Sequence, residues 1–453
     1  MMSGTPKYDV LVAGGGVAGL FLAYLTARAG FTVAVVEMKS EEKVGEKVCG
    51  DAVGEHHFRE VGLEPPRLGV DAVGVFEGVR VYSPSKRYSI TARGRGYALD
   101  RRAFGRRLLK MAADAGAELL ASHVVVKPIV EGEWVRGLRV RGSEGLRDLY
   151  SRVVVDATGA AAAVRTKLPS QWWVAYKAPL EDFNAAYRVV AEVEEEQDPR
   201  YALIYLDVDI APGGYWWWFP KGRHVVNVGL GVKAGTGENP RERFEKRLTP
   251  FLERAGAKIL HAGGGLVPTR RPSPCMVWNG LVAVGDAAYT ANPLHGGGIG
   301  PALLSSYHAA AYIASALEEG EASMEALWPY QAAYMNSYGA KQAALDAARI
   351  YLQALSNDDL EFIIERGIVS DEELTVMGYE GEIAGSVLSK ALTALKFLRR
   401  PSLLSDLRSL RSYARRARDL HARFPESPSG FPQWFREVEG LFIEVKARFW
   451  GRR

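Results

Sequence analysis

A glycine-rich turn between an apolar strand and a helix restricts how this chain can fold more than any other feature. Residues 8–13 are expected to form a short buried strand, residues 20–29 have the apolar spacing of a helix, and residues 32–36 form a second apolar strand. A strand, a helix and a strand in this order predict a βαβ unit, and therefore a parallel sheet in an α/β fold. The turn after the first strand has the pattern G-x-G-x-x-G, formed by Gly14, Gly16 and Gly19.

This turn meets the requirements of a dinucleotide-binding site. The first glycine permits the tight turn, the second lets a pyrophosphate approach the backbone, and the third lets the helix pack closely on the strand. The helix N-terminus adds free N–H groups and a partial positive charge. Glu37 ends the second strand, where an acidic side chain binds ribose hydroxyls and disfavours a 2′-phosphate. The expected contacts are Gly14, Gly16, Ala18, Gly19 and Glu37.

A second glycine-rich segment, far along the chain, points to the identity of the dinucleotide. An apolar strand at residues 281–284 is followed by Gly285-Asp286, and a loop at residues 293–300 precedes a long helix. The Asp286 carboxylate is suited to ribityl hydroxyls, and a helix N-terminus facing the pyrimidine edge of a flavin stabilises its reduced form. The alternative is a plain glycine-rich loop, but two sites suited to one cofactor favour FAD. The expected flavin contacts here are Asp286, Pro293, Gly297, Gly298 and Ile299.

The 453 residues leave room for two or three domains. Alternating β-rich segments interrupt the α/β pattern, and the chain is largely helical after residue 326. We therefore expect a discontinuous cofactor domain, an inserted antiparallel-sheet substrate domain and a C-terminal helical region. The expected boundaries are 1–75, 96–168 and 275–325 for the first, 76–95 and 169–274 for the second, and 326–453 for the third.

Composition limits the setting in which the chain works. An apolar fraction of 47% and a charged fraction of 24% are those of a globular protein, and two cysteines cannot form a disulfide framework. No apolar run approaches the ~20 residues of a membrane span, and no secretory signal is visible. These features predict a cytoplasmic protein, with any membrane contact made from the surface. No metal ligands and no nucleic-acid partner are expected.

Charge is unevenly distributed along the chain. Residues 390–453 hold fifteen Lys and Arg against six Asp and Glu, whereas the remainder of the chain is mildly acidic. Such a basic tail favours an anionic lipid surface, a phosphorylated substrate or an acidic protein partner. The alternative is a solvated helix face without a partner.

Several motifs together resemble the flavoproteins related to p-hydroxybenzoate hydroxylase. Beyond the glycine turn and Glu37, the similarity includes Arg101 with Phe104, residues 156–159 with the sequence DATG, and Gly285-Asp286. The resemblance implies a Rossmann-like FAD domain of that type, in which Arg101 contacts FAD and the backbone near Val125 lies against the adenine. This chain has Gly105 where the family often has aspartate, which leaves the helix contacts there open.

An aromatic segment at residues 212–220 suggests the kind of substrate. On a strand, Tyr215, Trp217 and Phe219 point to one face, while Trp216 and Trp218 point to the other. An aromatic wall of this kind is suited to a long apolar substrate, although ordinary core packing is the alternative.

The same segment has the pattern P-x-x-Y-x-W-x-F-P, which is similar to the signature of geranylgeranyl reductases. Residues 47–52 (KVCGDA) resemble their cysteine-containing flavin loop, and residues 264–268 and 292–298 are also similar to that family. The similarity is closest to the archaeal enzymes that saturate the prenyl chains of ether lipids. It implies a digeranylgeranylglycerol phospholipid as substrate, and flavin contacts by Cys49, Gly50 and Ala52.

Reduction of an isolated alkene needs a hydride at one carbon and a proton at the other, because no carbonyl polarises the double bond. Cys49 is the first candidate for the proton donor, and Tyr215 and His295 are weaker ones. The alternative for Cys49 is a small residue packed on the flavin. Tyr215, Trp217 and Phe219 are the candidate substrate contacts.

The chain contains no second G-x-G-x-x-G between a strand and a helix, so no separate NADPH domain is expected. Reduced ferredoxin or another small carrier is the expected electron donor. Two other functions stay open: an FAD monooxygenase of an aromatic or polyprenyl substrate, and a prenyl-lipid carrier without catalysis.

Overall fold

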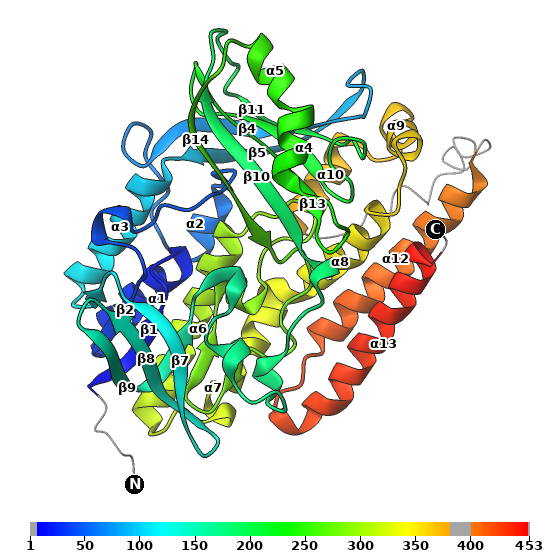
Figure 1. Ribbon diagram of the computed structural model, residues 1–453. Coiled ribbons are helices and arrows are strands. Elements are labelled where there is room, and N and C mark those ends of the chain that lie inside the picture. Colours follow the sequence, from blue (N-terminus) through cyan, green and yellow to red (C-terminus); the bar gives the residue numbers. More distant parts are fainter. Residues whose placement is uncertain (1–6, 381–399, 452–453) are drawn as a thin grey trace.

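The computed structural model describes residues 7–380 and 400–451, which form two sheets and a largely helical C-terminal region (Figure 1). In the first sheet, β1 pairs in parallel with β2 on one side and with β9 on the other, so that Val10 lies opposite both Val33 and Val153. The first sheet contains β15 (Val277–Trp278), β16 (Leu281–Ala283), β9 (Gly145–Asp156), β1 (Tyr8–Ala13), β2 (Val33–Val36) and β6 (Glu118–Leu120) in that order, with β7 (Val124–Glu131) and β8 (Trp134–Gly142) joined through β9. The predicted α/β fold is confirmed.

The second sheet is antiparallel except for one pair, β4 with β11. It contains β14 (Lys258–Val267), β10 (Asn184–Glu192), β13 (Val225–Lys233), β12 (Tyr215–Pro220), β11 (Tyr201–Tyr205), β4 (Ala72–Tyr82), β5 (Ser89–Leu99) and β3 (Ala52–Gly54) in that order. The predicted domain boundaries at residues 75 and 96 fall inside β4 and β5, respectively. Each of these strands runs without a break from one expected domain into the other. The division into domains stays a prediction.

The helices pack against both sheets, with α1 on β1 and β2 of the first sheet and α4 on β10 and β13 of the second. Helix α1 begins at Val17, directly after Gly16, so that Gly19 lies in its first turn, and it packs against α6 and α3. The helices are α1 (Val17–Arg28), α2 (His56–Glu60), α3 (Arg101–Asp114), α4 (Pro240–Arg247), α5 (Thr249–Arg254), α6 (Ile299–Glu319), α7 (Met324–Tyr334), α8 (Ala340–Leu352), α9 (Asn357–Glu365), α10 (Asp371–Glu380), α12 (Pro401–Ala422) and α13 (Phe431–Trp450). In Figure 1, α12 and α13 form a hairpin along one side of the molecule, and α12 packs against α8.

A buried cluster of charges holds the second sheet to α8. We call it the ionic joint, and it consists of Asp182, Arg270, Arg271, Asp346 and Arg349, all of them buried. Asp182 precedes β10 and pairs with Arg270 at 3.1 Å, while Arg349 of α8 bridges Asp182 at 3.2 Å and Asp346 at 2.7 Å. Arg271 follows β14 and reaches Asp346 at 3.2 Å. Ion pairs therefore fix the residue before β10 and the residues after β14 to the same helix, α8.

Candidate functional site

The glycine turn has the geometry that a bound pyrophosphate needs. Gly14 has φ +106°, and a Cβ there would lie 2.5 Å from the Ala157 carbonyl oxygen. A Cβ at Gly19 would lie only 2.0 Å from the Gly14 carbonyl oxygen, so this glycine is required for close packing of α1 on β1. A Cβ at Gly16 would meet no atom within 4 Å, and Gly16 caps α1 without a side chain. Open space therefore lies in front of free amides at the α1 N-terminus, as an anion requires.

Glu37 lies beside this turn at the end of β2. Its carboxylate is buried and accepts hydrogen bonds from the Gly15 amide at 2.7 Å and the Lys39 amide at 2.9 Å. The His123 amide donates to the Glu37 carbonyl, which brings the start of β7, with Val125 at its second position, to the same edge of the sheet. The predicted adenosine contacts Glu37 and Val125 are thus brought close together.

Arg101 provides a direct test of whether the site fits FAD. Its guanidinium is buried at the start of α3, and its Nε and Nη1 atoms have no hydrogen-bond partner in the described part of the chain. Buried donors without partners are costly, so they fit a ligand rich in acceptor oxygens such as FAD. Gly105, on the next turn of α3, lies against the backbone of Gly45, because a Cβ there would stand 2.2 Å from the Gly45 Cα. This contact explains why no aspartate fits at that position.

The flavin-ring segments predicted from both halves of the chain also meet. Asp286 forms an ion pair with Lys47 at 3.0 Å, and a Cβ at Gly298 would lie 3.1 Å from the Asp286 carboxylate. Pro293 is buried in the same loop, and Gly297 precedes α6, which begins at Ile299. The residue 47–52 loop, Asp286 and the α6 N-terminus therefore lie next to one another.

A buried amide that was not predicted from the sequence connects this loop to the aromatic strand. Asn227 of β13 donates to the Cys49 carbonyl oxygen at 2.8 Å and to the Asp51 carboxylate at 3.1 Å, and it accepts from Trp217 Nε1 at 3.0 Å. Lys221 pairs with the same carboxylate at 2.7 Å. The available signal was a single asparagine within the otherwise apolar strand at residues 225–232.

One face of the aromatic strand lies toward the flavin loop. Trp217 and Phe219 have ring centroids 6.0 Å apart, and a Cβ at Gly50 would lie 3.1 Å from the Phe219 ring. Trp216 instead stacks on Tyr205 at 3.8 Å within a separate core cluster on the other face. We call Tyr215, Trp217 and Phe219 the aromatic wall. Ala52 belongs to the same small cluster of apolar side chains as the wall.

Two of the three candidate proton donors are constrained electrostatically. The Tyr215 hydroxyl donates to the His295 carbonyl oxygen at 2.6 Å, and burial, reinforced by Cys49, raises the pKa of Tyr215 far above its usual range. Desolvation around the imidazole, followed by the nearby His57 and Lys341, lowers the pKa of His295 to about 4, although the residue as a whole is exposed. His295 Nδ1 also accepts from the Gly297 amide at 3.1 Å. His295 is therefore neutral near pH 7, and Tyr215 holds its proton firmly.

Similarity to known proteins identifies the family of this chain. Residues 9–167 match the family model of FAD dependent oxidoreductases, and residues 182–267 match the geranylgeranyl reductase catalytic domain. The digeranylgeranylglycerophospholipid reductase of Sulfolobus acidocaldarius is 40% identical over 444 residues, which cover 97% of this chain and 98% of that protein. The chain belongs to the geranylgeranyl reductase family. A relative with the same name from Methanoculleus marisnigri is 31% identical over 89% of this chain and 98% of its own length.

Solved structures agree with this assignment. A geranylgeranyl bacteriochlorophyll reductase-like protein of Thermoplasma acidophilum superposes with a TM-score of 0.77 and 27% identity, covering 90% of this chain and all of the other. A flavin-dependent brominase shares the fold at a TM-score of 0.65 and 19% identity. The predicted family, the FAD cofactor and the oxidoreductase class are confirmed. Within residues 7–380 and 400–451, no helix combines the length and the hydropathy needed to cross a membrane.

Proposed function

We propose that this chain reduces the isoprenoid C=C bonds of geranylgeranyl ether lipids, converting digeranylgeranylglycerol phospholipids into saturated archaeol-type lipids. The observation that carries the proposal is the position of the aromatic wall, which lies against the flavin loop and is fixed to it by Asn227. The wall lies within the segment that matches the reductase catalytic domain, and apolar aromatic faces suit a hydrocarbon chain.

The cofactor, the aromatic wall and the residues around Cys49 have different roles in the proposed reaction. Bound reduced FAD supplies the hydride for one alkene carbon, and a proton must reach the other carbon. Trp217 and Phe219 present ring faces that stabilise positive charge developing at the tertiary carbon. Asn227 and Arg188 hold the Cys49 carbonyl oxygen at 2.8 and 3.2 Å and thereby fix the loop that carries the thiol.

Cys49 is the proposed proton donor. Neutral His295 has no imidazolium proton to give near pH 7, and the Tyr215 hydroxyl is committed to the His295 carbonyl oxygen. The role that we assign to Tyr215 and His295 is therefore to position the substrate. The proposed FAD contacts are the glycine turn, Glu37, Arg101, Val125, Asp286 and the loop before α6.

The test of the proposed reaction is anaerobic incubation of the reduced holoenzyme with a geranylgeranyl lipid, followed by mass measurement. We expect a gain of two hydrogen atoms for each double bond reduced. A gain of oxygen in aerated samples would instead support the monooxygenase alternative. A protein that stays colourless after reconstitution with FAD would support the lipid carrier.

Replacing Cys49 with serine is expected to slow alkene reduction in anaerobic single turnovers by about tenfold or more, since serine is a much weaker acid in the same place. Rapid mixing of reduced enzyme with lipid measures this rate. Cys275→Ala is the matched control, because the Cys275 thiol is fully buried, donates to the Val277 carbonyl oxygen and has its pKa raised to about 12 by burial. An unchanged rate in the Cys49 variant would remove this thiol from the mechanism.

The basic C-terminal region supports a further part of the proposal, docking of reduced ferredoxin or another small acidic electron carrier. Arg408, Arg411 and Arg415 follow one another at helical spacing on α12, and all three are exposed. The same surface suits peripheral contact with the inner face of the cell membrane, which is consistent with the proposed cytoplasmic location.

We expect the double variant Arg411→Glu/Arg415→Glu to lower kcat/KM for reduced ferredoxin by about tenfold at low salt, and the wild-type value to fall with ionic strength. Turnover driven by dithionite should not change. The control is Arg241→Glu/Lys246→Glu, which makes the same change of charge on exposed positions of α4. Equal losses in both variants would contradict docking at α12.

A further inference from the structure

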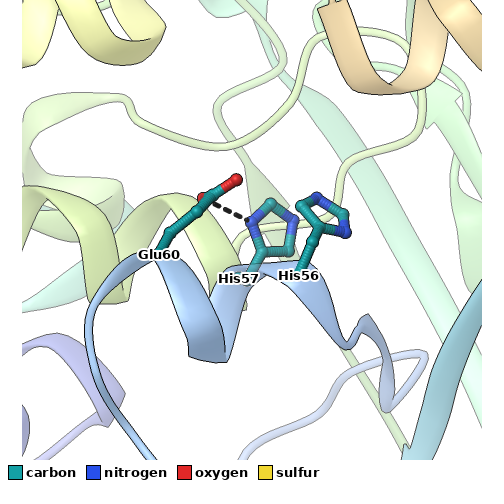
Figure 2. Close-up of side chains that lie close together, drawn as sticks. All are labelled: His56, His57 and Glu60. Carbon is teal, nitrogen blue, oxygen red and sulfur yellow. Dashed lines mark ion pairs between the residues drawn. The ribbon is translucent and has the colours of Figure 1, made fainter.

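Helix α2 carries three side chains whose donor atoms converge. His56, His57 and Glu60 each offer one potential metal-ligand atom, and these atoms lie within 4.8 Å of one another. Figure 2 shows the two imidazoles side by side and the Glu60 carboxylate directed at His57, with His57 Nδ1 3.5 Å from Glu60 Oε2. The two imidazole rings have centroids 3.9 Å apart.

Two glycines leave the space that the imidazoles occupy. A Cβ at Gly54 would lie 2.7 Å from the His56 ring, and a Cβ at Gly300 would lie 2.2 Å from the His57 ring. Gly54 ends β3, and Gly300 is the second residue of α6, against which α2 packs. Any side chain at either position would displace an imidazole, so neighbouring elements fix both rings.

We propose that His56, His57 and Glu60 bind a divalent transition-metal ion of the zinc type. Because the three donor atoms lie no more than 4.8 Å from one another, a central point lies within about 2.8 Å of each of them. Bonds of about 2.0–2.2 Å from these atoms to a zinc ion at that point need side-chain shifts below about 1 Å. Two imidazole nitrogens and one carboxylate oxygen form a three-ligand set with an open position for water.

The local charge favours this class of metal over Mg²⁺ or Ca²⁺. Glu60 is the one carboxylate of the set, and the Lys341 ammonium also acts on His56 and Glu60. Hard cations need several oxygen ligands and negative charge, whereas Zn²⁺, Co²⁺ and Ni²⁺ gain from imidazole coordination. No metal ligands were expected from the sequence.

All three proposed ligands lie on α2, and the His57 ring lies against Gly300 of α6. Metal binding would therefore fix the side chains of α2 next to the start of α6. No step of the proposed alkene reduction requires this ion.

The test is titration of the untagged, chelator-treated holoenzyme with Co²⁺. We expect visible ligand-field absorption that saturates at one equivalent with micromolar affinity, competition by Zn²⁺, and no competition by millimolar Mg²⁺. Glu60→Gln and His57→Ala should weaken binding by at least about tenfold, and the rise in Tm on adding Zn²⁺ should disappear. His224→Ala, which removes an exposed histidine from the turn between β12 and β13, serves as the control.

The readout does not depend on alkene reduction, and a normal flavin spectrum shows that each variant is folded. If His57→Ala does not fold, Glu60→Gln alone decides, because it keeps the shape of the side chain. No saturable Co²⁺ binding by the wild type, or unchanged affinity in Glu60→Gln, would overturn the proposal.

Discussion

Gly16→Ala is expected to give a stable protein that binds FAD about 100-fold more weakly, a loss of about 2.8 kcal/mol. Gly16 has φ −82° and ψ −174°, which alanine adopts readily, and its added Cβ would meet no protein atom within 4 Å. The same Cβ would occupy the space through which the pyrophosphate reaches the free amides of α1. Titration of the apoprotein with FAD measures the affinity, and thermal unfolding of the apoprotein measures its stability.

Two further glycines show whether this effect belongs to the cofactor. Gly440→Ala on α13 also adds a Cβ with no atom within 4 Å, and it should retain wild-type FAD affinity. Gly19→Ala should instead destabilise the apoprotein itself, because its Cβ would lie 2.0 Å from a backbone oxygen. Wild-type affinity in Gly16→Ala would mean that the space in front of α1 does not receive the pyrophosphate.

Asp346→Ala is expected to lower the free energy of unfolding by about 3–5 kcal/mol. Asp346 is fully buried and accepts from Arg349 and Arg271 of the ionic joint. Its removal takes away the carboxylate that lies between two buried guanidinium groups and leaves Arg349 with Asp182 and Arg271 with Glu439. Denaturant unfolding of the holoenzyme measures the change. Asp148→Ala breaks the partly exposed pair with Arg139 and should cost only about 0–1 kcal/mol.

The ionic joint also gives stability a defined dependence on pH. Burial opposes ionisation of Asp182, but Arg270, Arg349 and Arg271 together hold its pKa well below the usual range, and arginines likewise lower the pKa of Asp346. A carboxyl with a lowered folded pKa stabilises the fold above its unfolded pKa of about 4 and loses that contribution as pH falls further. The difference in stability between wild type and Asp346→Ala should therefore stay constant from pH 7 to about pH 5 and shrink below about pH 4. A difference that shrinks already near pH 6 would contradict this assignment.

The sequence predicted those parts of the site that rest on local spacing. The glycine turn lies where β1 meets α1, with Gly19 already in the helix. Alternation along β12 placed Trp217 and Trp216 on opposite faces, as the structure does. Contacts that depend on tertiary register were not predictable in the same way. Asn227 reaches Cys49 across 178 positions of sequence, and no local pattern specifies that partner.

The ionic joint was missed for a related reason. Arg270, Arg271 and Arg349 look like ordinary surface arginines in the sequence, and only the packing of α8 against both ends of the β10–β14 segment buries them. The contacts of Gly105 could not be predicted, because Gly105 lies against the backbone of Gly45, which belongs to a loop distant in sequence. The sequence therefore predicted the cofactor and the aromatic wall, but not the contacts that hold the wall and the flavin loop in place.

The amide of Asn227 has a consequence for redesign of this enzyme. Because one side chain contacts both Trp217 and the backbone of Cys49, enlarging the pocket at Trp217 also releases the loop beside the flavin. If Trp217 contacts the substrate and Cys49 donates the proton, as proposed, we expect substrate range and turnover to change together in variants of Trp217. Tyr215 has its hydroxyl on the His295 carbonyl oxygen instead, so it offers a place to accept bulkier lipids while the Cys49 loop stays anchored.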